Sequence, residues 1–168
     1  MVNRLLPLLI ILLFLSGCGY STVKRNASPL YGRLLHVNMF VNGSYQPNLD
    51  GELRLALLDE IAKSGTGELA AEQAADVTLS GEIESLVLEN AAFSASDKAM
   101  KYRFVLTVQA VLTERRSGTV FWKSKEIVRE EYPANADMAL QRNSRDAAIT
   151  ASCREMARRL VTQMNRAF

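Results

Sequence analysis

Alternating hydrophobic and polar residues predict four β-strands in this chain. The first expected strand covers residues 34–41, in which one side is formed by Leu35, Val37, Met39 and Val41. Three more are expected over residues 76–84, 100–113 and 119–131, and the compact turn between the last two predicts a β-hairpin. Alternation is lost beyond Ser85, which predicts a bulge or a strand that leaves the sheet, and residues 90–99 predict a loop.

Two other segments have helical periodicity. Residues 49–61 place apolar side chains four positions apart, and Gly65 and Gly67 follow as a stop signal. Residues 135–168 have Asp137 near their start and no later Pro or Gly. Their apolar stripe contains Leu140, Ala147, Ala148, Ala151, Met156, Leu160 and Met164. The order β, α, β, β, β, α predicts an α+β two-layer sandwich, with a four-stranded, mostly antiparallel sheet and two helices on one face.

The N-terminus is typical of an exported protein. An apolar run over residues 5–15 follows Arg4, and it is shorter than the roughly 20 residues that a transmembrane helix needs. Residues 1–17 are therefore expected to be a signal peptide. The junction Leu15-Ser16-Gly17-Cys18 resembles the lipobox of bacterial lipoproteins, which implies lipid on Cys18 after cleavage. Gly19 then implies sorting to the outer membrane, and the alternative is an ordinary signal peptide followed by a chance cysteine.

The remaining chain is expected to contain a tether and one domain. Residues 18–32 have no sustained period and suit a link between the lipid and the folded part. Residues 33–168 are long enough to bury a core without a metal ion or a disulfide, so we expect a single α+β domain. The 20 Lys and Arg residues nearly balance the 18 Asp and Glu residues, which argues against a nucleic-acid partner.

Candidate catalytic chemistry is sparse. Cys153 is expected to be a buried thiol because it lies beside an apolar stripe, and a free thiol or an intermolecular disulfide is the alternative. His36 is the only histidine, so no histidine pair exists to hold a metal ion. Glu82 and Glu84 alternate with an isoleucine and are expected to face solvent. We therefore expect no enzymatic activity, no metal site and no cofactor.

The expected hairpin is rich in basic residues. If its strands pair, Lys101, Arg103, Lys123, Lys125 and Arg129 lie on or near one mixed face and can attract phosphates. The alternative is that they are solvated residues neutralised by acidic neighbours such as Glu126 and Glu130.

The whole mature chain resembles the LptE family, the lipopolysaccharide-assembly lipoproteins of the Gram-negative outer membrane. The resemblance is carried by Cys18-Gly19-Tyr20, Phe40-Val41-Asn42, the segment from Ala75 to Ile83, Tyr102-Arg103-Phe104, the segment from Ser117 to Trp122, and the long closing helix. It implies two helices on a four-stranded sheet, and a plug inside the outer-membrane β-barrel LptD that helps deliver lipopolysaccharide.

Within that resemblance, basic residues of the hairpin are the candidate contacts for lipopolysaccharide phosphates. They are Lys101, Arg103, Arg115, Arg116, Lys123 and Lys125. Two other classes of function stay open. One is a periplasm-facing lipoprotein adaptor that binds another envelope protein or peptidoglycan, and the other is an envelope hydrolase, for which the sequence offers no pair of catalytic carboxylates.

Overall fold

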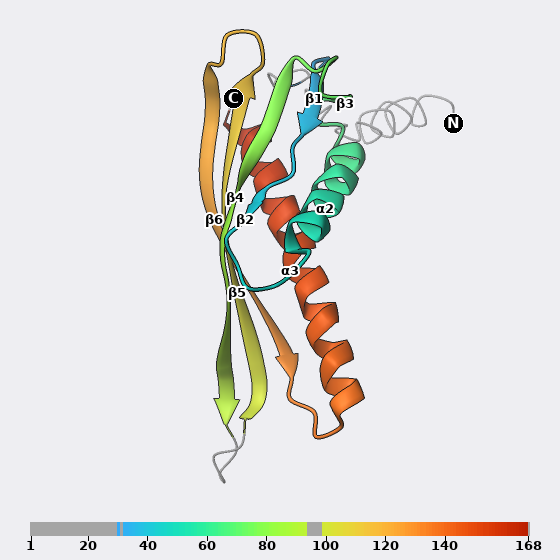
Figure 1. Ribbon diagram of the computed structural model, residues 1–168, viewed down its shortest axis with the longest axis vertical. Coiled ribbons are helices and arrows are strands. Elements are labelled where there is room, and N and C mark those ends of the chain that lie inside the picture. Colours follow the sequence, from blue (N-terminus) through green and yellow to red (C-terminus); the bar gives the residue numbers. More distant parts are fainter. Residues whose placement is uncertain (1–29, 31, 94–98, 168) are drawn as a thin grey trace, which may run out of the picture.

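The computed structural model describes residue 30, residues 32–93 and residues 99–167 (Figure 1). The expected signal peptide, Cys18 and nearly all of the tether lie outside this part of the chain. Leu30 is described and is buried in the core. Over the described residues, no helix is both apolar and long enough to cross a membrane.

The described chain folds into one six-stranded sheet with two helices on one face (Figure 1). The sheet order is β3-β1-β4-β5-β6, and β2 pairs with β4 beside β1. The strands are β1 (Leu34–Val37), β2 (Val41–Asn42), β3 (Glu68–Leu69), β4 (Val77–Phe93), β5 (Ala99–Glu114) and β6 (Val120–Pro133), and the helices are α2 (Leu49–Ser64) and α3 (Met138–Arg166).

The predicted α+β class with two helices on one face is confirmed, but four mostly antiparallel strands are wrong. The sheet is mixed, because β4 pairs in parallel with β1 and β2 and antiparallel with β5. The parallel pairs arise because α2 carries the chain back over the sheet between β1 and β4, whereas β4, β5 and β6 are antiparallel and follow one another after few residues. The two-residue strand β3, which pairs with β1, was not expected.

The expected first strand is broken at Phe40. Leu35 and Val37 are buried, but Met39 is 56% exposed and Val41 is 65% exposed, whereas Phe40 is buried. A Cβ atom on Gly81 of β4 would lie 2.5 Å from the Phe40 Cε1 atom, so the absence of a side chain there creates the site for this ring. Burial of the aromatic ring reverses the alternation, and the segment becomes two short strands.

Strand β4 continues beyond the expected loss of alternation. The register with β5 shifts between Ile83 and Ser85, which places a bulge at Glu84. The predicted bulge is thus confirmed, and the strand stays in the sheet as far as Phe93. The loop expected over residues 90–99 is therefore wrong for residues 90–93, where pairing with β5 overrides the weak local preference.

Helix α2 follows its periodicity closely. Its four buried residues are Leu49, Leu53, Leu57 and Ile61. The helix ends at Gly65, whose φ of 67° is the left-handed conformation that favours glycine, and the Gly65 N–H donates to the Ile61 carbonyl oxygen.

Helix α3 starts after Asp137, whose side chain accepts hydrogen bonds from the backbone N–H groups of Ala139 and Leu140. Its buried residues all lie between Ala148 and Met164. Leu140 and Ala147, expected in the apolar stripe, are exposed, because α2 does not extend to this end of the molecule (Figure 1).

The molecule therefore has two unequal halves along its long axis (Figure 1). In the two-helix half, α2 and the C-terminal part of α3 cover β1, β2, β3 and residues 77–83 of β4. In the one-helix half, only the N-terminal part of α3 accompanies residues 85–93 of β4 and their partners on β5 and β6.

Candidate functional site

The face of the sheet opposite the helices is the main candidate site, and we call it the open face. Side chains alternate across a strand, so the residues between the buried positions of β4, β5 and β6 project from this side. They are Thr78, Ser80, Glu82, Glu84, Ser85, Val87, Glu89, Lys101, Arg103, Val105, Thr107, Gln109, Val111, Thr113, Lys123, Lys125, Ile127, Arg129 and Glu131.

The middle of the open face is uncharged. Thr107 and Gln109 of β5 lie opposite Ser85 and Glu82 of β4, and they are half-buried by their neighbours. Threonine, serine and glutamine offer both donors and acceptors of hydrogen bonds, with valine side chains between them. Such a surface can be covered by another polar surface without the cost of burying an unpaired charge.

The two sides of the open face carry opposite charges. Strand β4 has three glutamates and no Lys or Arg, whereas β6 presents Lys123, Lys125 and Arg129. One ion pair crosses β5 between these sides, with 2.5 Å from the Lys125 Nζ atom to a Glu84 carboxylate oxygen. The open face therefore has an acidic border, a neutral centre and a basic border.

Two of the predicted lipopolysaccharide contacts are neutralised within the open face. The Arg103 guanidinium donates to the Glu131 carboxylate at 2.5 Å and lies 4.0 Å from Glu89, and Lys101 lies 3.7 Å from Glu131. The hydrogen bond from Arg103 lowers the pKa of Glu131 and raises that of Arg103 itself. These residues form an ion-pair cluster in the one-helix half.

The other four predicted contacts lie toward the opposite end of the hairpin. Arg115 donates to the backbone oxygen of Gln73, and Lys125 is paired with Glu84. Lys123 and Arg116 are exposed and form no ion pair with any described residue.

The structure does not gather all six predicted residues at one place. Lys123 lies opposite Val111, which is eight positions along β5 from Arg103, so roughly 27 Å separates them at about 3.4 Å per residue. Lys123 and Lys125 do lie on one face, two positions apart. Arg129 extends this row, and the free basic charges of the open face are therefore concentrated on β6.

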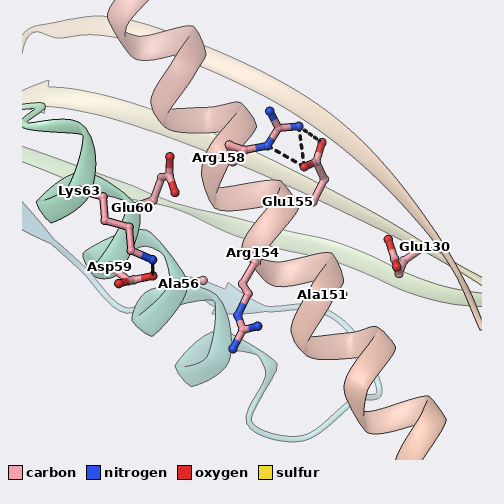
Figure 2. Close-up of a pocket in the computed structure, with 9 residues that line it drawn as sticks. All are labelled: Ala56, Asp59, Glu60, Lys63, Glu130, Ala151, Arg154, Glu155 and Arg158. Atoms are coloured by element: carbon pink, nitrogen blue, oxygen red, sulfur yellow. Dashed lines mark hydrogen bonds and ion pairs between the residues drawn. The ribbon is translucent and has the colours of Figure 1, made fainter.

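A second candidate is a groove of about 540 Å³ between α2 and α3 (Figure 2). Its charged lining is largely self-paired, since Lys63 lies 2.5 Å from Asp59 and Arg158 lies 2.7 Å from Glu155. Arg154 extends from α3 toward α2 and has no ion-pair partner among the described residues. Small-molecule sites are mostly apolar with a few convergent polar groups, and this open, mixed-charge groove differs from them.

Cys153 and His36 lie on opposite sides of the sheet. Cys153 is 1% exposed in the core, as predicted, and burial and the nearby Glu52 raise the pKa of its thiol to about 12. His36 alternates with buried Leu35 and Val37, and its Nδ1 atom lies 3.0 Å from the Ala70 carbonyl oxygen. A protonated thiol separated from the histidine by a sheet is not an activated nucleophile.

Sequence reasoning missed the neutral centre of the open face, because it searched for charge. The signal was present in the odd-numbered positions from Val105 to Thr113, which contain only Val, Thr and Gln. It also missed the arginines of α3, of which Arg159 donates to the Ile127 carbonyl oxygen of β6 at 3.0 Å.

Solved structures share this fold at low sequence identity. A protein from Xanthomonas campestris has a TM-score of 0.59 at 14% identity, over 84% of this chain and 88% of that chain. A PelC dodecamer from Paraburkholderia phytofirmans has a TM-score of 0.55 at 14% identity, over 83% of this chain and 93% of that chain. A minor lipoprotein from Acinetobacter baumannii has a TM-score of 0.53 at 14% identity, over 82% of this chain and 94% of that chain.

These likenesses show the arrangement of helices and strands and nothing finer. No curated protein sequence matches the chain. The family model for LptE, described as lipopolysaccharide-assembly, matches residues 33–164, which include every helix and strand of the described structure except the last two residues of α3. The chain therefore belongs to the LptE lipopolysaccharide-assembly family.

Proposed function

We propose that the protein is an outer-membrane lipoprotein that acts as plug and assembly partner of the β-barrel LptD and helps deliver lipopolysaccharide to the outer leaflet. In this proposal residues 1–17 are removed, Cys18 carries the lipid anchor, and residues 18–32 connect it to the domain over residues 33–168. The role is one of binding and needs no catalysis, metal ion or cofactor.

The open face is the observation that carries the plug proposal. The lumen of an outer-membrane barrel is polar, so a plug must satisfy hydrogen-bonding groups rather than cover an apolar wall. Thr107, Gln109 and Thr113 supply such groups on a sheet face that no described helix covers. The acidic border and the basic border make the surface electrostatically asymmetric, which favours one orientation of a bound partner over the reverse orientation.

Lipopolysaccharide phosphates are proposed to meet the basic border. Lys123 and Arg129 are exposed and form no ion pair with a described residue, and Lys125 can exchange Glu84 for a phosphate because exposed ion pairs are weak. The other predicted contacts are weaker candidates. Lys101 and Arg103 are held by Glu131, and Arg115 donates to a backbone oxygen. Arg116 has no ion-pair partner among the described residues, but it lies at the turn between β5 and β6.

The barrel partnership is tested by co-purification. Thr107→Glu places a charge at the neutral centre of the open face, and Thr162→Glu places the same charge on α3 at a similarly half-buried position. We expect recovery of LptD with the lipidated protein to fall at least about tenfold for Thr107→Glu, since an unpaired interfacial charge costs about 2–5 kcal/mol. Equal recovery with both variants, or no barrel with the unaltered protein, rejects the proposal and favours a periplasm-facing adaptor.

The lipopolysaccharide contact is tested separately, with the purified lipoprotein and lipopolysaccharide in detergent. Lys123→Glu is expected to weaken binding several-fold, because a basic contact becomes repulsive toward phosphate. Lys63→Glu on α2 is the control, since Lys63 is exposed but already paired with Asp59. If both changes weaken binding alike, the effect is one of net charge and the assignment to β6 is wrong.

A further inference from the structure

The outer edge of β4 changes character at the bulge. Up to Ile83 this edge is hydrogen-bonded, first to β1 and then to β2, and the last contact is from the Gly43 N–H to the Ile83 carbonyl oxygen at 2.9 Å. From Ser85 to Phe93, strand β4 is hydrogen-bonded to β5 along its inner edge, and no described strand pairs with its outer edge. About 30 Å of strand therefore presents unpaired backbone groups, at about 3.4 Å per residue.

The outer edge of β6 likewise pairs with no described strand, but it is protected. It carries three basic residues on the open face and ends at Pro133, and Arg159 of α3 donates to the Ile127 carbonyl oxygen at 3.0 Å. Charges, proline and side-chain caps are the devices by which proteins prevent a further strand from pairing with an exposed edge.

The β4 edge has fewer of these devices. Between Ser85 and Ala92 it has one charged residue, Glu89, and no proline. Its large apolar side chains are unusually accessible, with Val87 48% exposed and Leu88 50% exposed. The two edges of one sheet thus differ, since one is closed to strand addition and the other is open.

We infer that residues 85–93 of β4 bind an extended segment of a partner polypeptide, which adds to the sheet as a further strand. Main-chain hydrogen bonds to an exposed edge are a recurrent mode of peptide recognition. The inference concerns the backbone edge of the sheet, which borders the open face, and it does not depend on LptD being the partner.

The side chains of β4 define the chemistry of the added strand. Leu86 and Leu88 project toward the helix side, opposite Leu106 and Phe104, so alternate residues of the partner must be apolar there. On the open face its neighbours would be Ser85, Val87 and Glu89, and Glu89 is the one charged residue between Ser85 and Ala92. The partner segment therefore alternates apolar residues with polar ones, with Lys or Arg favoured beside Glu89.

The test uses the purified lipoprotein and a fluorescent seven-residue peptide that alternates valine and lysine, with binding followed by anisotropy. We expect saturable binding and slower amide hydrogen exchange within residues 85–93. The matched control is the same peptide with alternate amide nitrogens methylated, which keeps the side chains but removes main-chain donors. Its binding should be at least about tenfold weaker.

A pair of variants locates the site. Leu88→Lys adds a charge to the edge and should abolish peptide binding, whereas Leu140→Lys changes a similarly exposed leucine on α3 and should leave peptide binding unchanged. Equal binding of the methylated peptide, or protection of β6 in place of β4, overturns the inference. Peptide binding that survives Leu88→Lys overturns it as well.

Discussion

The two halves of this domain share three strands and one helix but differ in how completely they are covered. In the two-helix half, β4 contributes Val77, Leu79 and Ile83 to the core, each 0% exposed. In the one-helix half, no residue of β4 from Glu84 to Ala92 is buried, and neither is any residue in the first ten of α3. In that half the buried residues are supplied by β5 and β6, among them Phe104, Leu106, Val128 and Tyr132. The comparison teaches that β4 is part of the core in one half only, whereas in the other half it presents surface for a partner.

The sharpest way to break this comparison is to shorten one leucine in each half of the same strand. Leu79→Ala should destabilise the protein by about 2–5 kcal/mol, because it leaves a cavity in a closed core. Leu88→Ala should change the free energy of unfolding by roughly 0.5 kcal/mol or less, because half of that side chain is already in water. Urea unfolding measures both, and similar losses would contradict the division into halves.

A second change acts in the two-helix half, three residues before the bulge at Glu84. In Gly81→Ala the new Cβ atom would lie 2.1 Å from the Gln109 carbonyl oxygen and 2.5 Å from the Phe40 ring. Neither neighbour can yield without moving the sheet, so we expect a loss of about 1–3 kcal/mol in urea unfolding. Ser80→Ala, on the open face beside it, is the control and should be nearly neutral; equal effects would mean that the close approach is not what matters.

The third prediction concerns the start of α3 in the one-helix half. Asp137→Ala removes the acceptor for the N–H groups of Ala139 and Leu140 and should cost about 1 kcal/mol. Since no side chain in the first ten residues of α3 is buried, we expect faster amide exchange there and no change in α2. Exchange that stays slow at residues 139–141 would show that packing, rather than the cap, holds this end.

The smallest effect is expected from Glu131→Gln, which keeps an oxygen acceptor for Arg103 but removes the negative charge of the ion pair. Because the folded-state pKa of Glu131 is lowered, its contribution is complete above the unfolded-state pKa and disappears as pH falls through the folded-state pKa. The stability difference between variant and unaltered protein should therefore shrink on acidification. A difference that is independent of pH would assign the effect to something other than the carboxylate charge.

Sequence periodicity predicted the elements that depend on local pattern. Helix α2 and strand β5 were expected nearly as observed, because each buries one regular face along its length. The break at Phe40 was missed, since it depends on the absence of a side chain at Gly81 in another strand. Leu140 was assigned to a buried stripe because periodicity does not reveal where the covering layer ends.

The candidate site was predicted less well than the fold. The basic residues of β5 and β6 were identified, but their partners across the sheet were not, because pairing of Arg103 with Glu131 depends on strand register. The unprotected edge of β4 was invisible in the sequence, since an edge exists only once the sheet order is known.

The bulge at Glu84 adds one residue to β4 and thereby shifts the alternation of its side chains between the two faces of the sheet. With it, Leu86 and Leu88 face the same side of the sheet as Ile83. A deletion of that single residue would exchange the two faces of everything that follows, placing Val87 and Glu89 toward the helices and the leucines on the open face. Length at this position is therefore under stricter constraint than residue identity, and natural variants should differ here by substitution rather than by loss of a residue.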